Sequence, residues 1–69
     1  MMNFTVQTER EEDGRWLAEV AELPGVLVYG ESKDEAVSKA KALALRVVAD
    51  RLEHGEAASD LGDISFVAA

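Results

Sequence analysis

The first third of the chain alternates between apolar and polar residues, and this alternation predicts two half-buried β-strands. The first predicted strand spans residues 4–9 and the second spans residues 15–22. Within each strand, the positions expected to face a core share one parity. They are Phe4, Val6 and Thr8 in the first strand, and Trp16, Ala18 and Val20 in the second.

A tight hairpin turn joins these two strands. An Asp-Gly pair between alternating segments is typical of such a turn. A two-residue loop would place Val6 opposite Ala21. A three-residue loop, with Gly14 in the left-handed conformation, would place Val6 opposite Val20 instead. Because the second register gathers the large apolar side chains on one face of the sheet, we predict the three-residue loop.

A second turn and a short third strand follow. Pro24 and Gly25 stand in the order that positions i+1 and i+2 of a type II turn require. Residues 26–29 are then apolar on both parities, and Gly30 ends the run. One helix covers only one face of a sheet, so we expect apolar side chains to remain on the other face, where they form a candidate contact surface.

Residues 32–55 predict one long amphipathic helix. Ser32 and Glu35 form a capping box at its start, and Gly55 is placed to end it in the left-handed conformation. The small residues among the positions turned toward the sheet predict that helix and sheet pack closely. These positions form one stripe at helical spacing: Ala36, Val37, Ala40, Leu43, Ala44, Val47 and Val48.

A last strand is expected at residues 64–68, after a small polar loop at residues 56–62. The order β-β-β-α-β predicts an α+β fold, in which one long helix packs on one face of an antiparallel sheet. We expect residues 1–69 to form a single domain. Such a short chain has a small core and, without cysteine, no disulfide, so we expect a homo-oligomer, dimer or higher, or a bound partner to stabilise it.

The charge balance favours a protein partner over a nucleic acid. Seven Lys and Arg stand against 14 Asp and Glu, which gives a formal charge of −7, whereas phosphate contact needs clustered cations. An acidic surface suits a basic protein. No apolar run approaches the ~20 residues of a membrane helix, and no signal peptide opens the sequence. We therefore expect a cytoplasmic protein that contacts neither DNA nor a membrane.

The sequence offers few groups for catalysis. His54 is the only histidine and no nucleophile accompanies it in a triad-like pattern, so we interpret it as a solvated residue in the last helical turn. Glu9, Glu19 and Asp63 share the open face of the predicted sheet, which leaves the hypothesis of a metal site in the manner of a nuclease. Our prediction is a protein with no catalytic residue, no cofactor and no bound metal.

Four motifs follow one another along the chain: Trp16-Leu17-Ala18-Glu19, then Glu22-Leu23-Pro24-Gly25-Val26, then Gly30-Glu31-Ser32 followed by Glu35-Ala36, and finally Gly55-Glu56 after the helix. In this arrangement residues 4–56 resemble the HicB-type antitoxins. The resemblance implies a partial ribonuclease H-like fold without that enzyme's active site. It also implies the antitoxin role of a type II toxin–antitoxin system, in which the chain binds and masks a small basic, HicA-like toxin that cleaves messenger RNA.

The chain departs from the family pattern in three places. Val26 stands where the family often has cysteine, and residues 57–59 replace its usual proline-rich stretch. Residues 1–69 also contain no C-terminal helix-turn-helix or ribbon-helix-helix segment. We therefore expect no DNA-binding domain and no repression of transcription by this chain.

The resemblance directs attention to the surface around the second turn. We expect the carboxylates of Glu22 and Glu31 to steer a basic partner, and Leu27 and Tyr29 to supply apolar contact area if they face outward. The alternative is an orphan small oligomeric domain without a toxin, either a binding module or a weak relative of a metal-dependent nuclease. A neighbouring gene for a short basic protein would favour the antitoxin, and its absence would favour the orphan.

Overall fold

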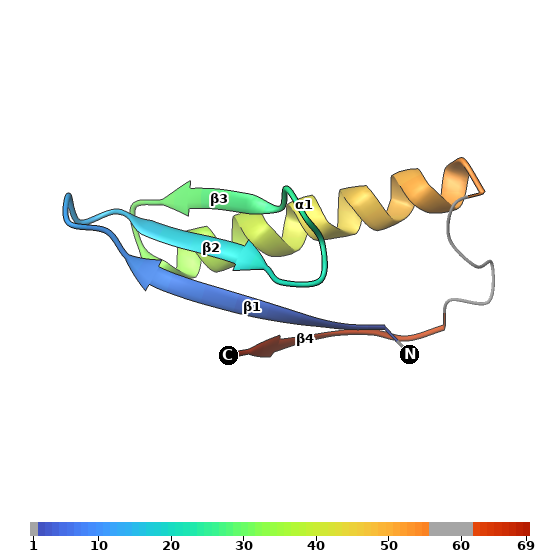
Figure 1. Cartoon of the computed structure of the whole chain (residues 1–69), viewed down its shortest axis with the longest axis horizontal. Coiled ribbons are helices and arrows are strands. Elements are labelled where there is room, and N and C mark those ends of the chain that lie inside the picture. The colour runs from blue at the N-terminus through green and yellow to red at the C-terminus, as the bar shows by residue number, and fades with distance from the viewer. Residues whose placement is uncertain (1, 56–61) are drawn as a thin grey trace.

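The computed structural model describes residues 2–55 and 62–69. This part of the chain forms a four-stranded sheet of order β3-β2-β1-β4, with one helix lying across one face (Figure 1). The elements are β1 (Met2–Arg10), β2 (Trp16–Val20), β3 (Leu27–Gly30), α1 (Lys33–Glu53) and β4 (Ile64–Ala68). The predicted α+β fold and its element order are confirmed. Except for Gly62, the loop predicted at residues 56–62 lies outside the described residues.

The sheet is mixed, so the prediction of a wholly antiparallel sheet is wrong for one strand. β2 runs antiparallel to both β1 and β3, whereas β4 runs parallel to β1. Two hairpin turns give β1 and β3 the same direction, and α1 then carries the chain back across the sheet. β4 therefore enters beside β1 in the same direction, as a crossover connection requires.

The first hairpin has the predicted register. Val6 lies opposite Val20 in the ladder between β1 and β2. The amide of Gly14 donates to the carbonyl of Glu11 at 3.0 Å, and Gly14 has a φ of +92°. The three-residue loop with its left-handed glycine is therefore confirmed.

The second turn is also confirmed, and it is anchored in the core. The carbonyl of Leu23 accepts a hydrogen bond from the amide of Val26 at 3.1 Å, and Gly25 has a φ of +91°, as a type II turn requires. The side chains of Leu23 and Val26 are both buried. This turn therefore fixes the start of β3 on the side of the sheet that faces α1.

The core lies between α1 and the facing side of the sheet. Ala36, Ala40 and Ala44 are fully buried on α1, which confirms the predicted stripe of small residues. A Cβ atom built on Gly30 would lie only 2.6 Å from the backbone nitrogen of Ala36, so α1 and β3 are in very close contact. The buried core comprises Phe4, Val6, Ala18, Val20, Leu23, Val26, Ala36, Ala40, Ala44 and Val48.

Both ends of α1 are capped by the residues that the sequence indicates. The hydroxyl of Ser32 accepts a hydrogen bond from the amide of Glu35 at 3.1 Å. The carboxylate of Glu35 accepts from the amide of Glu31 at 3.2 Å, whereas a capping box would direct it to Ser32. At the other end, Gly55 has a φ of +69° and its amide donates to the carbonyl of Leu52 at 3.2 Å. Among the described residues, no helix has the length and apolar character to cross a membrane.

Candidate protein-binding surface

The face of the sheet opposite α1 is covered by no other element in the described part of the chain (Figure 1). We call it the open face. The strand registers place its side chains in rows that cross the sheet. The open face consists of Asn3, Thr5, Gln7 and Glu9 on β1, Leu17 and Glu19 on β2, Leu27 and Tyr29 on β3, and Ser65 and Val67 on β4.

One corner of the open face is apolar. Leu17 lies opposite Tyr29 in the ladder between β2 and β3, and Leu27 is two residues from Tyr29 on the same side. Leu27 is 46% exposed and Tyr29 is 41% exposed. These three residues form what we call the apolar patch. Both parities of residues 26–29 are apolar, so the sequence left their direction open; Leu27 and Tyr29 face outward, because the buried parity of this segment holds Val26 and Gly30.

Carboxylates border the apolar patch on two sides. On the sheet, Glu9 lies opposite Leu17 and Glu19 lies opposite Leu27. At the end of the sheet, the acidic loop between β1 and β2 shares a shallow hollow with Tyr29, lined also by Glu11, Glu12, Asp13 and Arg15. An apolar centre inside a charged border is the usual anatomy of a protein-binding surface.

The ring of Tyr29 is positioned by a neighbouring ion pair. The guanidinium carbon of Arg15 lies 4.5 Å from the ring centroid, within the range of a cation–π contact. The Nε atom of Arg15 also donates to the carboxylate of Asp13 at 2.8 Å. Hydrogen bonds from the backbone amide and the side chain of Arg15 lower the pKa of Asp13. The sequence analysis did not assign Arg15 to this surface, although Arg15 shares a parity with Leu17.

Glu22 has a structural role that the sequence did not indicate. Its two carboxylate oxygens accept hydrogen bonds from the backbone amide and the hydroxyl of Thr5, each at 2.7 Å. These bonds, the backbone one first, lower the pKa of Glu22. They fasten the turn between β2 and β3 to β1. The role of Glu22 toward a partner stays a prediction.

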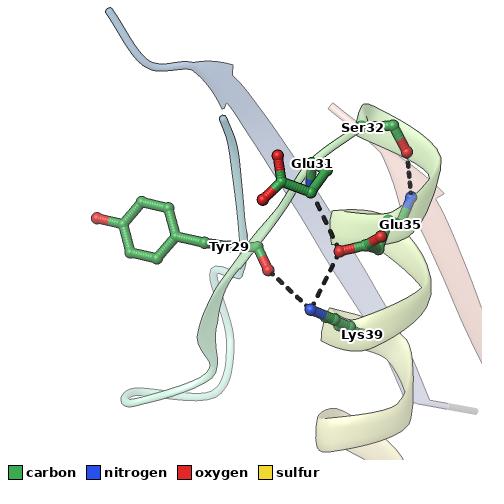
Figure 2. A network of polar contacts seen from close by, with 5 residues as sticks. All are labelled: Tyr29, Glu31, Ser32, Glu35 and Lys39. Atoms are coloured by element: carbon green, nitrogen blue, oxygen red, sulfur yellow. Dashed lines mark hydrogen bonds and ion pairs between the residues drawn. The ribbon is translucent and has the colours of Figure 1, made fainter. Parts of the chain in front are cut away.

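Glu31 belongs to a network that joins the end of β3 to α1 (Figure 2). Its amide donates to Glu35, which also pairs with Lys39 at 3.1 Å. The ammonium of Lys39 reaches the carbonyl of Tyr29 at 3.4 Å, while the Tyr29 ring points away from α1 (Figure 2). The hydrogen bond from Lys39 and that from the Glu31 amide lower the pKa of Glu35. The Tyr29 ring is therefore presented outward while its backbone is held by the helix.

The structure brings together no metal site among the described residues. No group of three or more His, Cys, Asp or Glu side chains is placed to hold a metal ion there. Glu9 and Glu19 share the open face on neighbouring strands. Asp63 instead precedes β4, where its carbonyl accepts a hydrogen bond from the amide of Met2 at 2.8 Å. We do not carry the metal hypothesis further.

His54 lies at the exposed end of α1, as predicted. Its Nδ1 atom is 2.8 Å from the carbonyl oxygen of Asp50 and 3.3 Å from the carboxylate of the same residue. Both contacts are local to the last helical turn. These contacts with Asp50 give His54 a local structural explanation at the end of α1.

No protein-family model, curated protein or solved structure matches this chain. The resemblance to the HicB-type antitoxins thus stays a prediction from the sequence motifs. The geometry gives Pro24, Gly25, Gly30, Ser32 and Gly55 structural explanations in turns, close packing and helix caps.

Proposed function

We propose that this chain is a cytoplasmic protein-binding module of the antitoxin kind, which binds and masks a small basic toxin that cleaves messenger RNA. The observation that carries the proposal is the apolar patch of Leu17, Leu27 and Tyr29 inside its border of carboxylates. A few residues, enriched in aromatic side chains such as that of Tyr29, supply most of the binding energy at protein interfaces. The surrounding acids select a partner of opposite charge.

The charge of the border fits the chemistry of an RNA-cleaving partner. Such a partner needs a cationic surface to hold phosphate groups. Glu9 and Glu19 on the open face, together with the acidic loop at residues 11–13, offer anionic groups that compete for that surface. The formal charge of −7 adds long-range attraction to the encounter. Masking by occupancy requires no catalytic group of the chain's own.

The apolar patch also supports a second candidate function, self-association of a small orphan domain. Leu27 and Tyr29 are exposed at one edge of the sheet, and a two-fold dimer would cover both copies of the patch. Sedimentation equilibrium distinguishes a monomer of 7.5 kDa from a dimer or a higher oligomer. If the patch joins two copies, Leu27→Ser should dissociate them, and a basic partner should compete with the dimer.

Binding kinetics test the antitoxin proposal. The ligand is a short basic protein whose gene neighbours that of this chain, and the absence of such a gene would favour the orphan domain. Association and dissociation are measured at two salt concentrations. Tyr29→Ala should speed dissociation, because it removes an anchor at the centre of the contact. Glu9→Lys should slow association and weaken its salt dependence, because Glu9 lies in the border of the apolar patch and border charges act mainly on the on-rate.

Glu22 is excluded from the charge-reversal test because its bonds to Thr5 stabilise the fold. Val67→Ala is the matched control for Tyr29→Ala. Val67 is 50% exposed on the same face, but it lies on β4, at the opposite edge of the sheet from β3. Wild-type kinetics in Tyr29→Ala, or an equal effect of Val67→Ala, would place the interface elsewhere on the domain.

A further inference from the structure

A groove on the side of the sheet that faces α1 is bordered by positive charges, whereas the open face carries negative ones. α1 packs chiefly on β2 and β3, and β4 lies at the far edge of the sheet (Figure 1). The helix-facing side chains of β4 are therefore only partly covered: Ile64 and Phe66 are half-buried. The groove lies where α1 leaves this edge of the sheet uncovered.

The groove encloses a cavity of about 90 Å³ between α1, β1 and β4. Its apolar wall is formed by Val6, Val37 and Phe66, Thr8 adds one hydroxyl, and residues 67–69 line it at the end of β4. Two lysines of α1, Lys33 and Lys41, complete the lining on the helix side. A small apolar hollow with a few polar groups at its border is the common form of a ligand site.

The two lysines lie close to half-buried aromatic rings that pack against the core. The Lys41 ammonium lies 5.7 Å from the centroid of Phe66, and the Lys33 ammonium lies 5.9 Å from that of Trp16. Both distances fall within the range of a cation–π contact. These contacts hold both ammonium groups near the cavity, where a bound anion can reach them.

The charges of these lysines are not compensated within the described part of the chain. Neither Lys33 nor Lys41 forms an ion pair there, whereas Lys39 pairs with Glu35 on another side of the same helix. Asp34 follows Lys33 in the first helical turn, yet it pairs with neither lysine. In a chain of formal charge −7, these two lysines place positive charge beside one apolar hollow.

A third cation extends this basic border. Arg10 lies two residues beyond Thr8 on β1, on the same parity, and it is exposed at the end of the strand. Its ladder partner is Trp16, the residue whose ring contacts Lys33. Within the described residues, Arg10 forms no ion pair either. The helix-facing end of β1 is thus basic, while the open face of the same strand carries Glu9.

We propose that the groove binds a small organic carboxylate, an anion with a short branched apolar body. The carboxylate would accept charge-assisted hydrogen bonds from Lys33 and Lys41, with the hydroxyl of Thr8 as a further donor. The apolar body would pack against Val37 and Phe66. A cavity of about 150 Å³ accommodates benzene, so the 90 Å³ here limits the body to less than a benzene ring. This site is separate from the open face and does not depend on the antitoxin proposal.

The test uses isovalerate as the probe and isovaleramide, its neutral isostere, as the ligand control. Two-dimensional NMR spectra of the whole chain are recorded during titration with each compound at neutral pH. Isovalerate should shift the signals of Val6, Thr8, Val37 and Phe66 with a saturable profile. Isovaleramide should bind about tenfold more weakly, because it lacks the charge-assisted hydrogen bonds.

Variants compared in pairs distinguish specific binding in the groove from general attraction of the anion by positive charge. Lys41→Gln should weaken isovalerate binding about tenfold, as the loss of one charged hydrogen bond does. Arg46→Gln is the matched control, since it removes the same charge from an exposed position of α1 that does not line the groove. Val37→Leu should fill the cavity and abolish binding. If that variant fails to fold, the lysine variant and its control still decide.

Three results would overturn the proposal. The first is the absence of any saturable shift in the wild-type chain. The second is equal affinity for isovalerate and isovaleramide, which would indicate an apolar void that does not recognise an anion. The third is equal weakening by Lys41→Gln and Arg46→Gln, which would indicate net charge alone.

Discussion

Replacing Gly30 with alanine tests the closest approach between α1 and the sheet. The added Cβ atom would lie 2.6 Å from the backbone nitrogen of Ala36, 3.0 Å from its Cα and 3.1 Å from the carbonyl carbon of Glu35. Ordinary van der Waals contact begins at 3.4 Å. All three atoms belong to the backbone, so no side chain can rotate away. The start of α1 and the end of β3 must therefore move apart.

The cost of Gly30→Ala follows from this geometry. Overpacking in a core costs about 1–3 kcal/mol, and the backbone on both sides of Gly30 places this variant at the upper end of that range. Separation would also loosen the contact between the sheet and the buried Ala36 and Ala40. A domain of this size has roughly 3–5 kcal/mol of stability in total. Gly30→Ala should thus lose most of the free energy of unfolding.

Urea unfolding followed by the fluorescence of Trp16 measures this loss. The transition midpoint should fall while its slope stays unchanged, because the surface exposed on unfolding is nearly the same. Gly14→Ala is the control: its Cβ meets nothing within 4 Å, but its φ of +92° carries a strain cost of about 1–2 kcal/mol. If Gly30→Ala does not fold in buffer, trimethylamine N-oxide restores a measurable transition. A stability equal to wild type, or above that of Gly14→Ala, would refute the close approach.

Further predictions concern the helix cap, the helix face, acid stability and DNA. Ser32→Ala should cost about 1 kcal/mol in thermal unfolding because it removes the N-cap acceptor, and an unchanged melting temperature would argue against the cap. Ala40→Phe should cost about 1–3 kcal/mol or prevent folding, and a wild-type melt would mean that this helix face is misassigned. Hydrogen bonds from Thr5 lower the pKa of Glu22 below 4.5 in the folded chain, so its carboxylate stabilises the fold above that pH, and this stabilisation is lost as the pH falls through the folded pKa. Glu22→Gln should therefore flatten the acid side of the stability profile, and a profile identical to that of the wild type would show that this carboxylate does not contribute. In a gel-shift assay at low salt the chain should not retard DNA, and specific retardation would contradict the protein-binding proposal.

Local patterns predicted much of the fold. Gly14 determined the hairpin register, and Ser32 and Gly55 determined the bounds of α1, because turn and cap chemistry acts over a few neighbouring residues. The position and direction of β4 did not follow in the same way. The alternation of residues 64–68 predicts a strand but says nothing about which strand it pairs with.

The candidate site was predictable only in part. Strand parity placed Leu27 and Tyr29 on the same face, but both parities of residues 26–29 are apolar, so parity alone did not decide which face lies outward. The hydrogen bonds between Glu22 and Thr5 join positions 17 residues apart, and no local sequence pattern predicts such a contact. The position of Lys33 and Lys41 beside the groove could not be predicted either, because their surroundings depend on where β4 lies. Arg15 could have been assigned to the open face from its parity with Leu17.

The most direct test of the proposed function looks for a neighbouring gene that encodes a short basic protein and measures RNA cleavage by that protein. Wild-type chain should suppress cleavage in proportion to the amount added, until the toxin is saturated. Leu27→Ala and Tyr29→Ala should suppress it less, while Leu52→Ala, an exposed position on α1, should act as wild type. Undiminished cleavage at saturating wild-type chain, or equal suppression by all three variants, would contradict masking through the open face.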